Sequence, residues 1–342
     1  MPTKVVVYED SGWQRLLPLV YIRAVCQLVC GMGDLLSKVR RLTAGIGQPL
    51  ELWCRPGLAE STAEQTGLIT NQPQPEGALF LNGRGLWSAL PQVEPGEAAW
   101  VGTVGPEIAC VFADARLAAT LTPPVLLDQA KLSSTLAGIP RRPIAGVQLF
   151  QWPWELVRDN ERQLVRDWDE RVLGEPGQHS AIAQGSYLVN PDRVHIGADS
   201  KIKPCVVIDA EDGPVWIGRG VRIFPHSYVQ GPAFIGDGTL LQPGSVVHSG
   251  TTIGPRSKVG GEIEASIIQG FSNKQHDGFL GHSYVGSWVN IAADCINSDL
   301  KNTYGTIRVP INGREVETNE MFVGMLVGDY SKAGINVSFP TG

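Results

Sequence analysis

The segment Ser272–His282 concentrates side chains whose types and spacing could do chemistry. It reads Ser-Asn-Lys-Gln-His-Asp-Gly-Phe-Leu-Gly-His, so two histidines stand six residues apart and Lys274 lies just before the first. An imidazole with an unperturbed pKa of ~6.5 accepts a proton near neutral pH, and a positioned general base is worth roughly 10²–10⁴-fold in rate. His276 is therefore a candidate base. The alternative is a purely structural histidine in a polar loop.

The N-terminal half offers basic side chains rather than an obvious nucleophile. Arg15, Arg23 and Lys38 could hold phosphate groups, because guanidinium and ammonium donors bind phosphate oxygens. Surface or helix-capping roles are the equal alternative for these three residues.

Aliphatic residues recur every six positions through the C-terminal half, and a small or β-branched residue follows four positions after most of them. The aliphatic series is Ile196, Ile202 and Ile208 and then, after a short insertion at Gly213-Pro214, Ile217, Ile223, Val229, Ile235, Leu241, Val247, Ile253 and Val259. The small companions include Ser200, Val221, Ser227, Ala233, Thr239, Ser245, Thr251 and Ser257. This period predicts short strands joined by tight corners.

Three glycines set the length of one coil. Gly218, Gly236 and Gly254 recur every eighteen residues, which is three hexads, so each coil holds three strands and three corners. Each coil would stack its aliphatic residues on the next and pair its amides as in a parallel sheet. A sheet with helical crossovers would need roughly a dozen residues between strands, and they are absent. The pattern predicts a parallel β-helix.

The strict period breaks twice, over residues 260–282 and again over about 295–322. Fragments of the repeat return between and after these stretches, at Val285-Gly286, Ile291, Val327-Gly328, Ala333 and Phe339. We expect both stretches to be insertions that leave the β-helix as loops on one side, where binding groups gather.

The N-terminal half reads as an α/β layer. Residues 4–8 form a buried-strand candidate and residues 16–41 combine a turn with an amphipathic helix. Further apolar runs, whose spacing suits a parallel sheet, lie at residues 50–54, 78–81, 98–101 and 108–112. Residues 149–172 are predicted to form a helix that leads to the β-helix, with Trp152 and Trp154 in the core.

Composition excludes several classes of protein. The 342 residues carry a net charge of −6, and no run approaches the ~18 apolar residues of a membrane span. The N-terminus lacks the build of a signal peptide, and six cysteines without a CxxC pair suggest neither a zinc cage nor a disulfide framework. We expect a cytoplasmic protein with no nucleic-acid or membrane partner.

The order of residues in the N-terminal half resembles a divergent branch of the sugar-1-phosphate nucleotidyltransferases. It is carried by Glu9, Asp10, Leu17, Pro18, Leu19, Arg23, Gly31 and Gly33, with the later LFQWPWELV stretch. The resemblance implies a Rossmann-like domain, a nucleotide such as UTP and a Mg²⁺ ion, with Arg15, Arg23 and Lys38 as phosphate ligands. The family's glycine-rich loop and aspartate are replaced here by YEDSGWQRLLPL and by Asn82, whose amide is a poorer magnesium ligand than a carboxylate.

The stretch from Ser272 through Ala293 resembles the acetyltransferase half of the bifunctional glucosamine-1-phosphate acetyltransferase and N-acetylglucosamine-1-phosphate uridylyltransferase family. That family has a basic histidine in K-x-x-H-x-x-Y-L-G-D and a sugar-binding asparagine in N-I-G-A-G. The resemblance implies a left-handed β-helix, acetyl-CoA as donor, His276 as catalytic base and Asn290 as a sugar ligand. Backbone amides near Ala293 would contact acetyl-CoA and the developing oxyanion.

Several positions depart from the family pattern. Phe279 replaces a tyrosine, Asp299 replaces a second sugar-binding asparagine, and Asn273 replaces a lysine, with Lys274 one place closer to the histidine. We expect Phe279 and Asp299 to contact the acceptor, and Lys274 and Lys301 to flank the pocket as phosphate partners.

A metal site is the rival interpretation of the histidines. Hexapeptide β-helices also serve carbonic anhydrases, which bind zinc through three histidines, two of them five residues apart. Of His226, His248, His276 and His282, the nearest pair is six apart. We therefore predict no metal site.

The sequence predicts a nucleotidyltransferase-like domain over residues 1–165, a linker over 166–182 and an acyltransferase-like β-helix over 183–342. The predicted activity is N-acetyl transfer to an amino-sugar phosphate, first of all glucosamine-1-phosphate, coupled to nucleotidyl transfer giving UDP-N-acetylglucosamine for the cell envelope. The alternatives are nucleotidyl transfer alone and a non-catalytic sugar-nucleotide-binding protein. The resemblance also implies a homotrimer.

Overall fold

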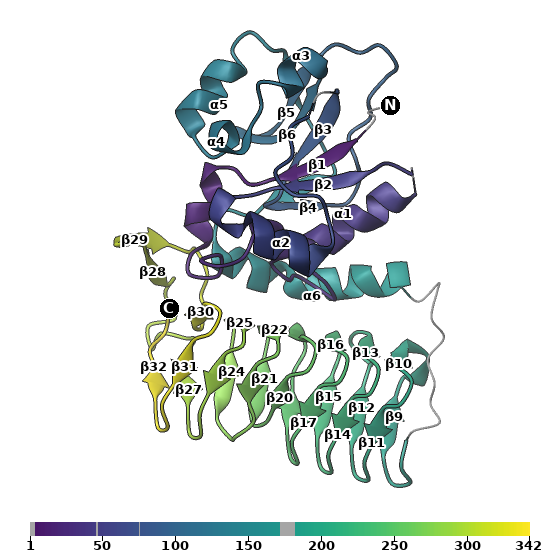
Figure 1. Cartoon of the computed structure of the whole chain (residues 1–342). Helices are drawn as coiled ribbons and strands as arrows, with labels where there is room; N and C mark the ends of the chain where they lie inside the picture. Colours follow the sequence, from purple (N-terminus) through teal and green to yellow (C-terminus); the bar gives the residue numbers. More distant parts are fainter. Residues whose placement is uncertain (1–3, 46, 75, 172–181) are drawn as a thin grey trace. The chain divides into compact units, whose positions relative to one another are not determined.

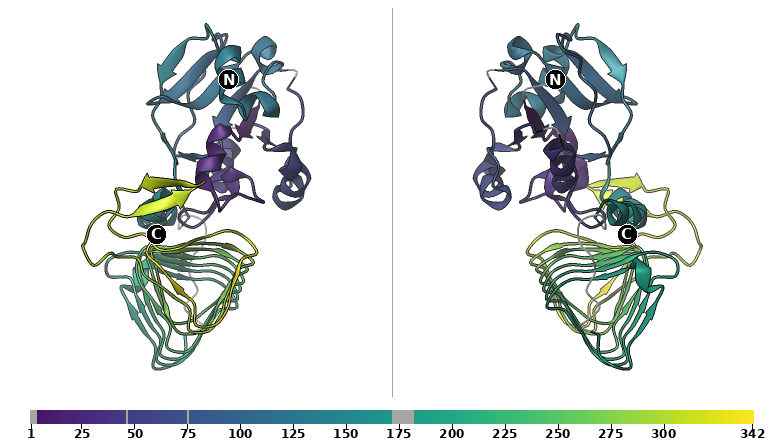
Figure 2. Two further views of the ribbon diagram at one scale, coloured as in Figure 1. Left: turned by 90° about the vertical axis from the view of Figure 1, so that its left-hand side faces the viewer. Right: turned by 90° about the vertical axis from the view of Figure 1, so that its right-hand side faces the viewer.

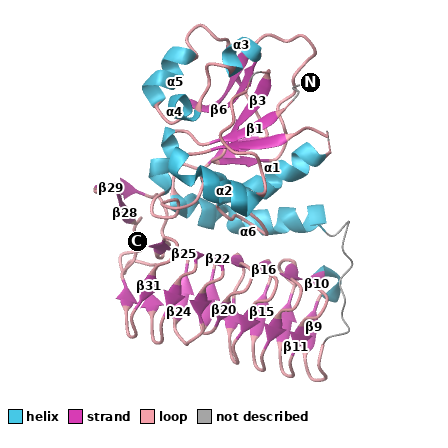
Figure 3. Ribbon diagram, in the orientation of Figure 1, coloured by secondary structure: helices cyan, strands magenta, loops and turns pink. Residues whose placement is uncertain are grey.

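The chain divides into two compact units. The computed structural model describes residues 4–45, 47–74, 76–171 and 182–342. The first unit comprises Met1–Leu16, Ile22–Leu28 and Gly33–Gln151, and the second comprises Leu17–Tyr21, Val29–Met32 and Trp152–Gly342. The last α-helix, α6 (Pro153–Arg171), is followed along the chain by short strands (Figure 3). Of the linker predicted over residues 166–182, residues 172–181 lie outside the described residues.

A six-stranded mixed sheet forms the centre of the first unit. Its strands lie in the order β2 (Leu50–Trp53), β1 (Val5–Tyr8), β3 (Ala78–Asn82), β6 (Glu107–Ala113), β5 (Trp100–Val104) and β7 (Arg141–Pro143). β6 runs antiparallel to both of its neighbours, and the other contacts are parallel. The prediction of a parallel sheet is therefore wrong at β6. Only two residues join Val104 to Glu107, and so short a connection can make only a hairpin.

Helices cover both faces of this sheet. Side chains alternate along β1, so Val5 and Val7 join one apolar cluster with α1 (Leu35–Ala44), while Val6 and Tyr8 join another. The second cluster is covered by α3 (Ala115–Ala118), α4 (Pro123–Leu126) and α5 (Gln129–Thr135). The unit also contains α2 (Ala59–Thr66), the antiparallel pair β4 (Gly85–Trp87) and β8 (Val147–Leu149), and the 3₁₀ helices η1 (Ser11–Leu16), η2 (Val25–Gln27) and η3 (Pro56–Leu58).

Three ladders of short parallel strands form the faces of the β-helix in the second unit (Figure 1). The first face comprises β10 (Val194–Ile196), β13 (Val215–Ile217), β16 (Ala233–Ile235), β19 (Thr251–Ile253), β22 (Ile267–Gly270), β25 (Tyr284–Ser287) and β30 (Leu326–Val327). The second face comprises β11 (Lys201–Ile202), β14 (Arg222–Ile223), β17 (Leu240–Leu241), β20 (Lys258–Val259), β23 (Asn273–Lys274), β26 (Asn290–Ile291) and β31 (Lys332–Ala333). The third face comprises β9 (Tyr187–Val189), β12 (Val207–Asp209), β15 (Tyr228–Gln230), β18 (Val246–Val247), β21 (Glu262–Glu264) and β24 (Phe279–Gly281). The helix η4 (Pro191–Arg193) precedes β10.

The predicted hexads form the core of this β-helix, whose coils trace a triangle when viewed along the axis (Figure 2). All eleven predicted aliphatic residues from Ile196 to Val259 are buried in one cluster. Ser200 shows how the small companions act, because its hydroxyl donates to the Gly218 carbonyl of the next coil at 2.7 Å. A Cβ on Gly218 would meet the backbone nitrogen of Asp237 on the next coil at 2.8 Å, so this corner requires glycine. The predicted fold class is confirmed.

The two predicted insertions have different outcomes. Residues 260–282 stay in the β-helix, so the prediction that they form a loop is wrong. The period is lost because coils shorten to fifteen residues, as from Thr252 to Ile267, or seventeen, as from Asn273 to Asn290. The second insertion is real. Between β27 (Ile296–Asn297) and its partner β32 (Ser338–Phe339), the chain forms the hairpin of β28 (Arg308–Ile311) and β29 (Arg314–Glu317).

Helix α6 packs on the first face of the β-helix. The amide of Asn160 donates to the Thr252 hydroxyl at 3.0 Å, and the rings of Trp168 and Trp216 meet edge to face. Trp154 is buried, as predicted, and stacks on half-buried Trp152. Within the described residues, every helix falls short of the length and apolarity that crossing a bilayer requires.

Candidate functional site

The predicted base lies on an edge of the β-helix. His276 occupies the corner between β23 and β24, and its side chain is exposed. Nε2 of Gln275 lies 3.3 Å from Nε2 of His276, so the two side chains lie within hydrogen-bond distance on this corner. An exposed ring on a corner can meet a ligand that arrives from solvent.

Asn290 and Ala293 lie on the coil that follows His276. Asn290 is exposed on β26, and its Oδ1 accepts a hydrogen bond of 2.7 Å from the amide of Asn273 on the previous coil. Ala293 lies in the corner between β26 and β27, at the same edge as the corner of His276. We name His276, Asn290, Ala293 and Asn273 the edge cluster. Three of these residues, His276, Asn290 and Ala293, were predicted site residues, and their roles stay predictions. Asn273 joins them through its hydrogen bond to Asn290.

Lys274 fixes the corner that carries His276. It is only 2% exposed and takes the inward place that Val259 occupies one coil earlier. Its ammonium donates to the carbonyls of His276 at 2.5 Å, Asp277 at 3.3 Å and Gly260 at 3.3 Å. Burial lowers the pKa of this ammonium. All three of its N–H donors have backbone acceptors, which leaves none for the predicted phosphate contact in this conformation.

Replacement of Lys274 by methionine tests this positioning role. The variant leaves the three carbonyls of the corner without their donor, and we expect a loss of about 2–3 kcal/mol in stability. Thermal denaturation should show a lower Tm, and hydrogen exchange should rise over residues 275–278. Lys203→Met is the matched control, because Lys203 is an exposed lysine on the corner between β11 and β12, at the same edge of the β-helix. Equal effects of the two substitutions would contradict the positioning role.

Asp299 lies at the far end of β24 from His276 and pairs with another histidine. Its Oδ2 is 2.8 Å from Nδ1 of His282, and the imidazole stacks on Phe322 at 4.9 Å between ring centroids. The sequence named Asp299 as an acceptor contact and considered His282 only as a metal ligand, so their pairing was missed. The available signal was their separation of seventeen residues, which equals one local coil.

Phe279 and Lys301 lie in different surroundings and do not form one binding group. Phe279 is half-buried on β24, and a Cβ on Gly281 would meet its ring at 2.4 Å. Lys301 begins the second insertion, and its ammonium donates to the Thr306 carbonyl at 2.6 Å. The predicted roles of both residues in acceptor binding stay predictions.

In the first unit, a buried ion-pair network lies where β1 and β3 end. Arg84, which is 0% exposed, binds Asp10 through two hydrogen bonds, of 2.8 Å from Nε and 2.6 Å from a terminal nitrogen. Asn82 donates a third hydrogen bond to Asp10 at 2.8 Å. Burial alone would raise the pKa of Asp10, but the Arg84 guanidinium outweighs it and holds the pKa below its ordinary value. Asp10 is therefore ionised.

The three predicted phosphate ligands lie apart in this unit. Arg15 donates to both oxygens of Glu107, at 3.2 and 3.3 Å. Arg23 is half-exposed, and its carbonyl accepts a hydrogen bond of 2.7 Å from Arg55. Lys38 is buried on α1. The structure gathers no phosphate clamp from these three, and their nucleotide-binding role stays a prediction.

The implied Mg²⁺ ion can be tested against the residues present. Magnesium requires carboxylate oxygens with free lone pairs and room for water. Asp10 is engaged by Arg84, Glu107 by Arg15 and Arg84, and Glu9 by two hydrogen bonds from the Arg55 side chain, at 3.1 and 3.3 Å. The described residues also contain no group of three or more metal-binding side chains. These residues do not fit a magnesium ion.

Comparison with known proteins agrees with this architecture. Residues 5–173 match the family model described as Sugar nucleotidyl transferase. The "Bifunctional protein GlmU" of Rippkaea orientalis is 28% identical over 162 residues, covering 42% of this chain and 36% of the relative. The protein of the same name from Methanocaldococcus jannaschii is 32% identical over 81 residues, covering 24% and 20%. The matched part of the chain thus spans about a third or less of these relatives. The N-terminal half of the chain therefore contains a sugar nucleotidyl transferase domain, and the chain is similar over part of its length to proteins named bifunctional GlmU.

Proposed function

We propose that the β-helix transfers an acetyl group from acetyl-CoA to the nitrogen of an amino-sugar phosphate, with glucosamine-1-phosphate as the first candidate. The observation that carries this proposal is the edge cluster, which combines the exposed imidazole of His276 with the exposed amide of Asn290 on the next coil. Similarity to proteins named bifunctional GlmU supports it.

The reaction needs a base at this edge. The sugar ammonium must lose a proton before its nitrogen can attack the thioester carbonyl, and His276 would accept that proton. A C–N bond forms, the C–S bond breaks, and the protonated imidazole returns its proton to the departing thiolate of coenzyme A. The new amide nitrogen releases its remaining excess proton to solvent. Asn290 would hold the sugar, and backbone amides near Ala293 would stabilise the oxyanion.

Release of free thiol from acetyl-CoA tests the proposal. Purified full-length chain is incubated with acetyl-CoA and a panel of sugar phosphates, and we expect release with glucosamine-1-phosphate but none with glucose-1-phosphate, which has no amine. Equal release with both sugars would indicate hydrolysis of the thioester and contradict acetyl transfer.

Nucleotidyl transfer to a sugar-1-phosphate is the second candidate function, and the family match over residues 5–173 favours it. We propose UTP as the donor, giving UDP-N-acetylglucosamine. Charged side chains gather near the ends of β1 and β3, but their carboxylates are committed to arginines. Pyrophosphate release from UTP and N-acetylglucosamine-1-phosphate is the measurement. No release would leave this domain as a binding module.

The assembly and cellular role belong to the same proposal. We propose a cytoplasmic homotrimer of amino-sugar nucleotide biosynthesis, in which the second face of the β-helix meets a neighbouring subunit. Exposed polar side chains line that face at Lys201, Arg222, Lys258, Asn290 and Lys332. Light scattering after size exclusion tests the trimer, and a monomer that retained full activity would contradict a shared site.

A further inference from the structure

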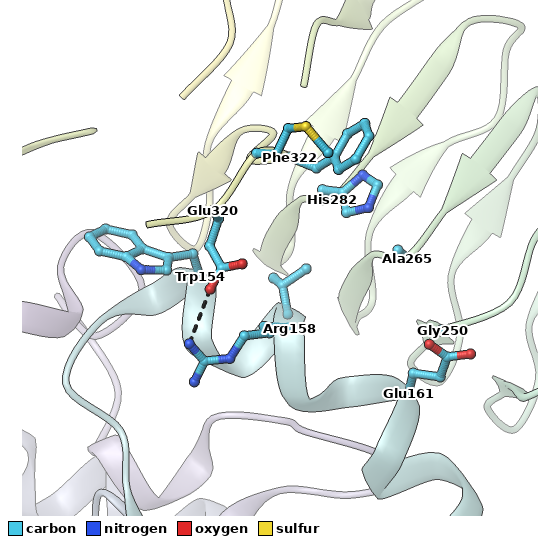
Figure 4. Close-up of a pocket in the computed structure, with 10 residues that line it drawn as sticks. Trp154, Arg158, Glu161, Gly250, Ala265, His282, Glu320 and Phe322 are labelled. Carbon is cyan, nitrogen blue, oxygen red and sulfur yellow. Dashed lines mark hydrogen bonds and ion pairs between the residues drawn. The ribbon is translucent and has the colours of Figure 1, made fainter. Parts of the chain in front are cut away.

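A cavity of about 310 Å³ lies within the second unit, away from the edge cluster. Figure 4 shows its walls, which come from α6, from the corner between the third and first faces, and from the second insertion. His276 and His282 flank β24, so the edge cluster and this cavity lie at opposite ends of one strand. Six extended residues span at most ~20 Å, which makes the two places neighbours but distinct.

The cavity exists because small residues occupy one corner of the β-helix. Gly250, Ala265 and His282 lie at this corner on three successive coils, each with left-handed backbone at φ of 70°, 41° and 46°. A Cβ on Gly250 would meet the Cα of Ala265 at 3.4 Å, which shows how closely these coils stack. The first two positions have almost no side chain and leave a hollow, and the imidazole of His282 closes one end of it.

His282 is held in one orientation at the wall of the cavity. Asp299 accepts from Nδ1 at 2.8 Å, and Phe322 stacks on the ring. A carboxylate on Nδ1 fixes the tautomer in which Nδ1 carries the proton, so Nε2 is left as a hydrogen-bond acceptor. The side chains of His282 and Asp299 are 23% and 13% exposed, so both are largely shielded from bulk water.

The charges that line the cavity are predominantly negative. Glu161 on α6 has no hydrogen-bond or ion-pair partner among the described residues, whereas Glu320 pairs with Arg158 at 3.1 Å. Asp299 adds a third carboxylate behind His282. Arg158 is the only arginine or lysine among the residues that line the cavity, and it also pairs with Asp159. The field in the cavity therefore favours a cation and opposes a phosphate.

We propose that this cavity binds an unphosphorylated amino sugar. Its ammonium group would pair with Glu161 and Glu320, and its hydroxyls would donate to these carboxylates or to Nε2 of His282 and accept from Arg158. The C–H faces of the sugar ring would lie against Phe322. An apolar ligand would desolvate Glu161 without giving it a partner, and a phosphorylated sugar would meet like charge.

Isothermal titration of the full chain with glucosamine, in the absence of acetyl-CoA, tests the proposal independently of acetyl transfer. The comparison ligands are glucose, which has no ammonium, and glucosamine-6-phosphate, which adds a phosphate. At a pH where the amine is protonated, we expect glucosamine to bind about tenfold more tightly than either. Equal affinity for glucose, tighter binding of the phosphorylated sugar, or no detectable binding would overturn the proposal.

Matched variants locate the ligand. Glu161→Gln should weaken glucosamine binding about tenfold and leave glucose binding unchanged, because it removes charge but keeps an amide of similar shape. Glu170→Gln is the control, since Glu170 is another exposed glutamate on α6 and lies outside the cavity. His276→Ala should retain glucosamine binding. Loss of binding in that variant, or wild-type affinity in Glu161→Gln, would place the ligand elsewhere and overturn the assignment.

Discussion

Replacement of His276 by alanine is expected to lower the turnover of acetyl transfer by roughly 100-fold or more while leaving acceptor affinity nearly intact. The imidazole acts only when the ammonium loses its proton, so its removal affects kcat rather than binding. Asn290, which is expected to hold the sugar, lies on the next coil and is untouched by the substitution. Thiol release at varied acceptor concentration gives kcat and KM separately.

His226 provides the control for this experiment. It is an exposed histidine on the corner between β14 and β15, at the same edge of the β-helix as His276 but on an earlier coil. His226→Ala should therefore keep wild-type turnover and a similar Tm. A His276→Ala variant that turned over acceptor at the wild-type rate would remove the general-base role, and a joint fall in both variants would indicate a structural effect.

Replacement of Arg84 by methionine is expected to lower the stability of the first unit by about 3–5 kcal/mol, because it leaves the buried carboxylate of Asp10 without its guanidinium partner. Arg84 is wholly buried, and its guanidinium also donates to the Phe150 carbonyl at 2.8 Å. Asp10 would keep its carboxylate but lose its partner. Thermal or urea denaturation followed by tryptophan fluorescence measures the loss, since Trp87 and Trp100 report on this unit.

The stability of the first unit should depend on pH because Arg84 stabilises the ionised form of Asp10. The folded state holds the pKa of Asp10 below its ordinary value near 3.8, so the stabilisation is fully present above that value and is lost as the pH falls through the folded pKa. Arg84→Met should remove this acid-sensitive part of the stability profile. The double variant Asp10→Asn with Arg84→Met should recover part of the loss. An Arg84→Met protein as stable as wild type would contradict the buried-pair account.

The sequence was sufficient for the β-helix because its core repeats with a fixed period. Residues such as Ile217 and Ile235 occupy inward positions in each coil, and burial requires an aliphatic side chain at every one of them. Gly218 recurs for an equally local reason, since the next coil leaves no room for a Cβ. The edge cluster could be predicted for a different reason, because the resemblance to a known family assigned His276 and Asn290 without any knowledge of the coil geometry.

The other features of the structure depend on contacts between residues that the six-residue period does not predict. A coil shorter than eighteen residues interrupts the six-residue period, so the sequence suggests that the β-helix ends there. The strands of Asn273 and Asn290 nevertheless pair as in the longer coils. The contact between His282 and Asp299 follows only once the local coil length is known. Arg84 and Asp10 are far apart along the chain, and nothing at either residue predicts that β1 and β3 bring them together.

The most direct test of the account is to follow the acetyl group itself. Full-length chain is incubated with acetyl-CoA labelled with ¹³C in the acetyl group and with glucosamine-1-phosphate, and the sugar product is examined by mass spectrometry and NMR. We predict that the label appears on the sugar nitrogen with the wild-type chain and is reduced at least 100-fold with His276→Ala. Absence of labelled sugar with the wild-type chain, or equal labelling by both proteins, would contradict it.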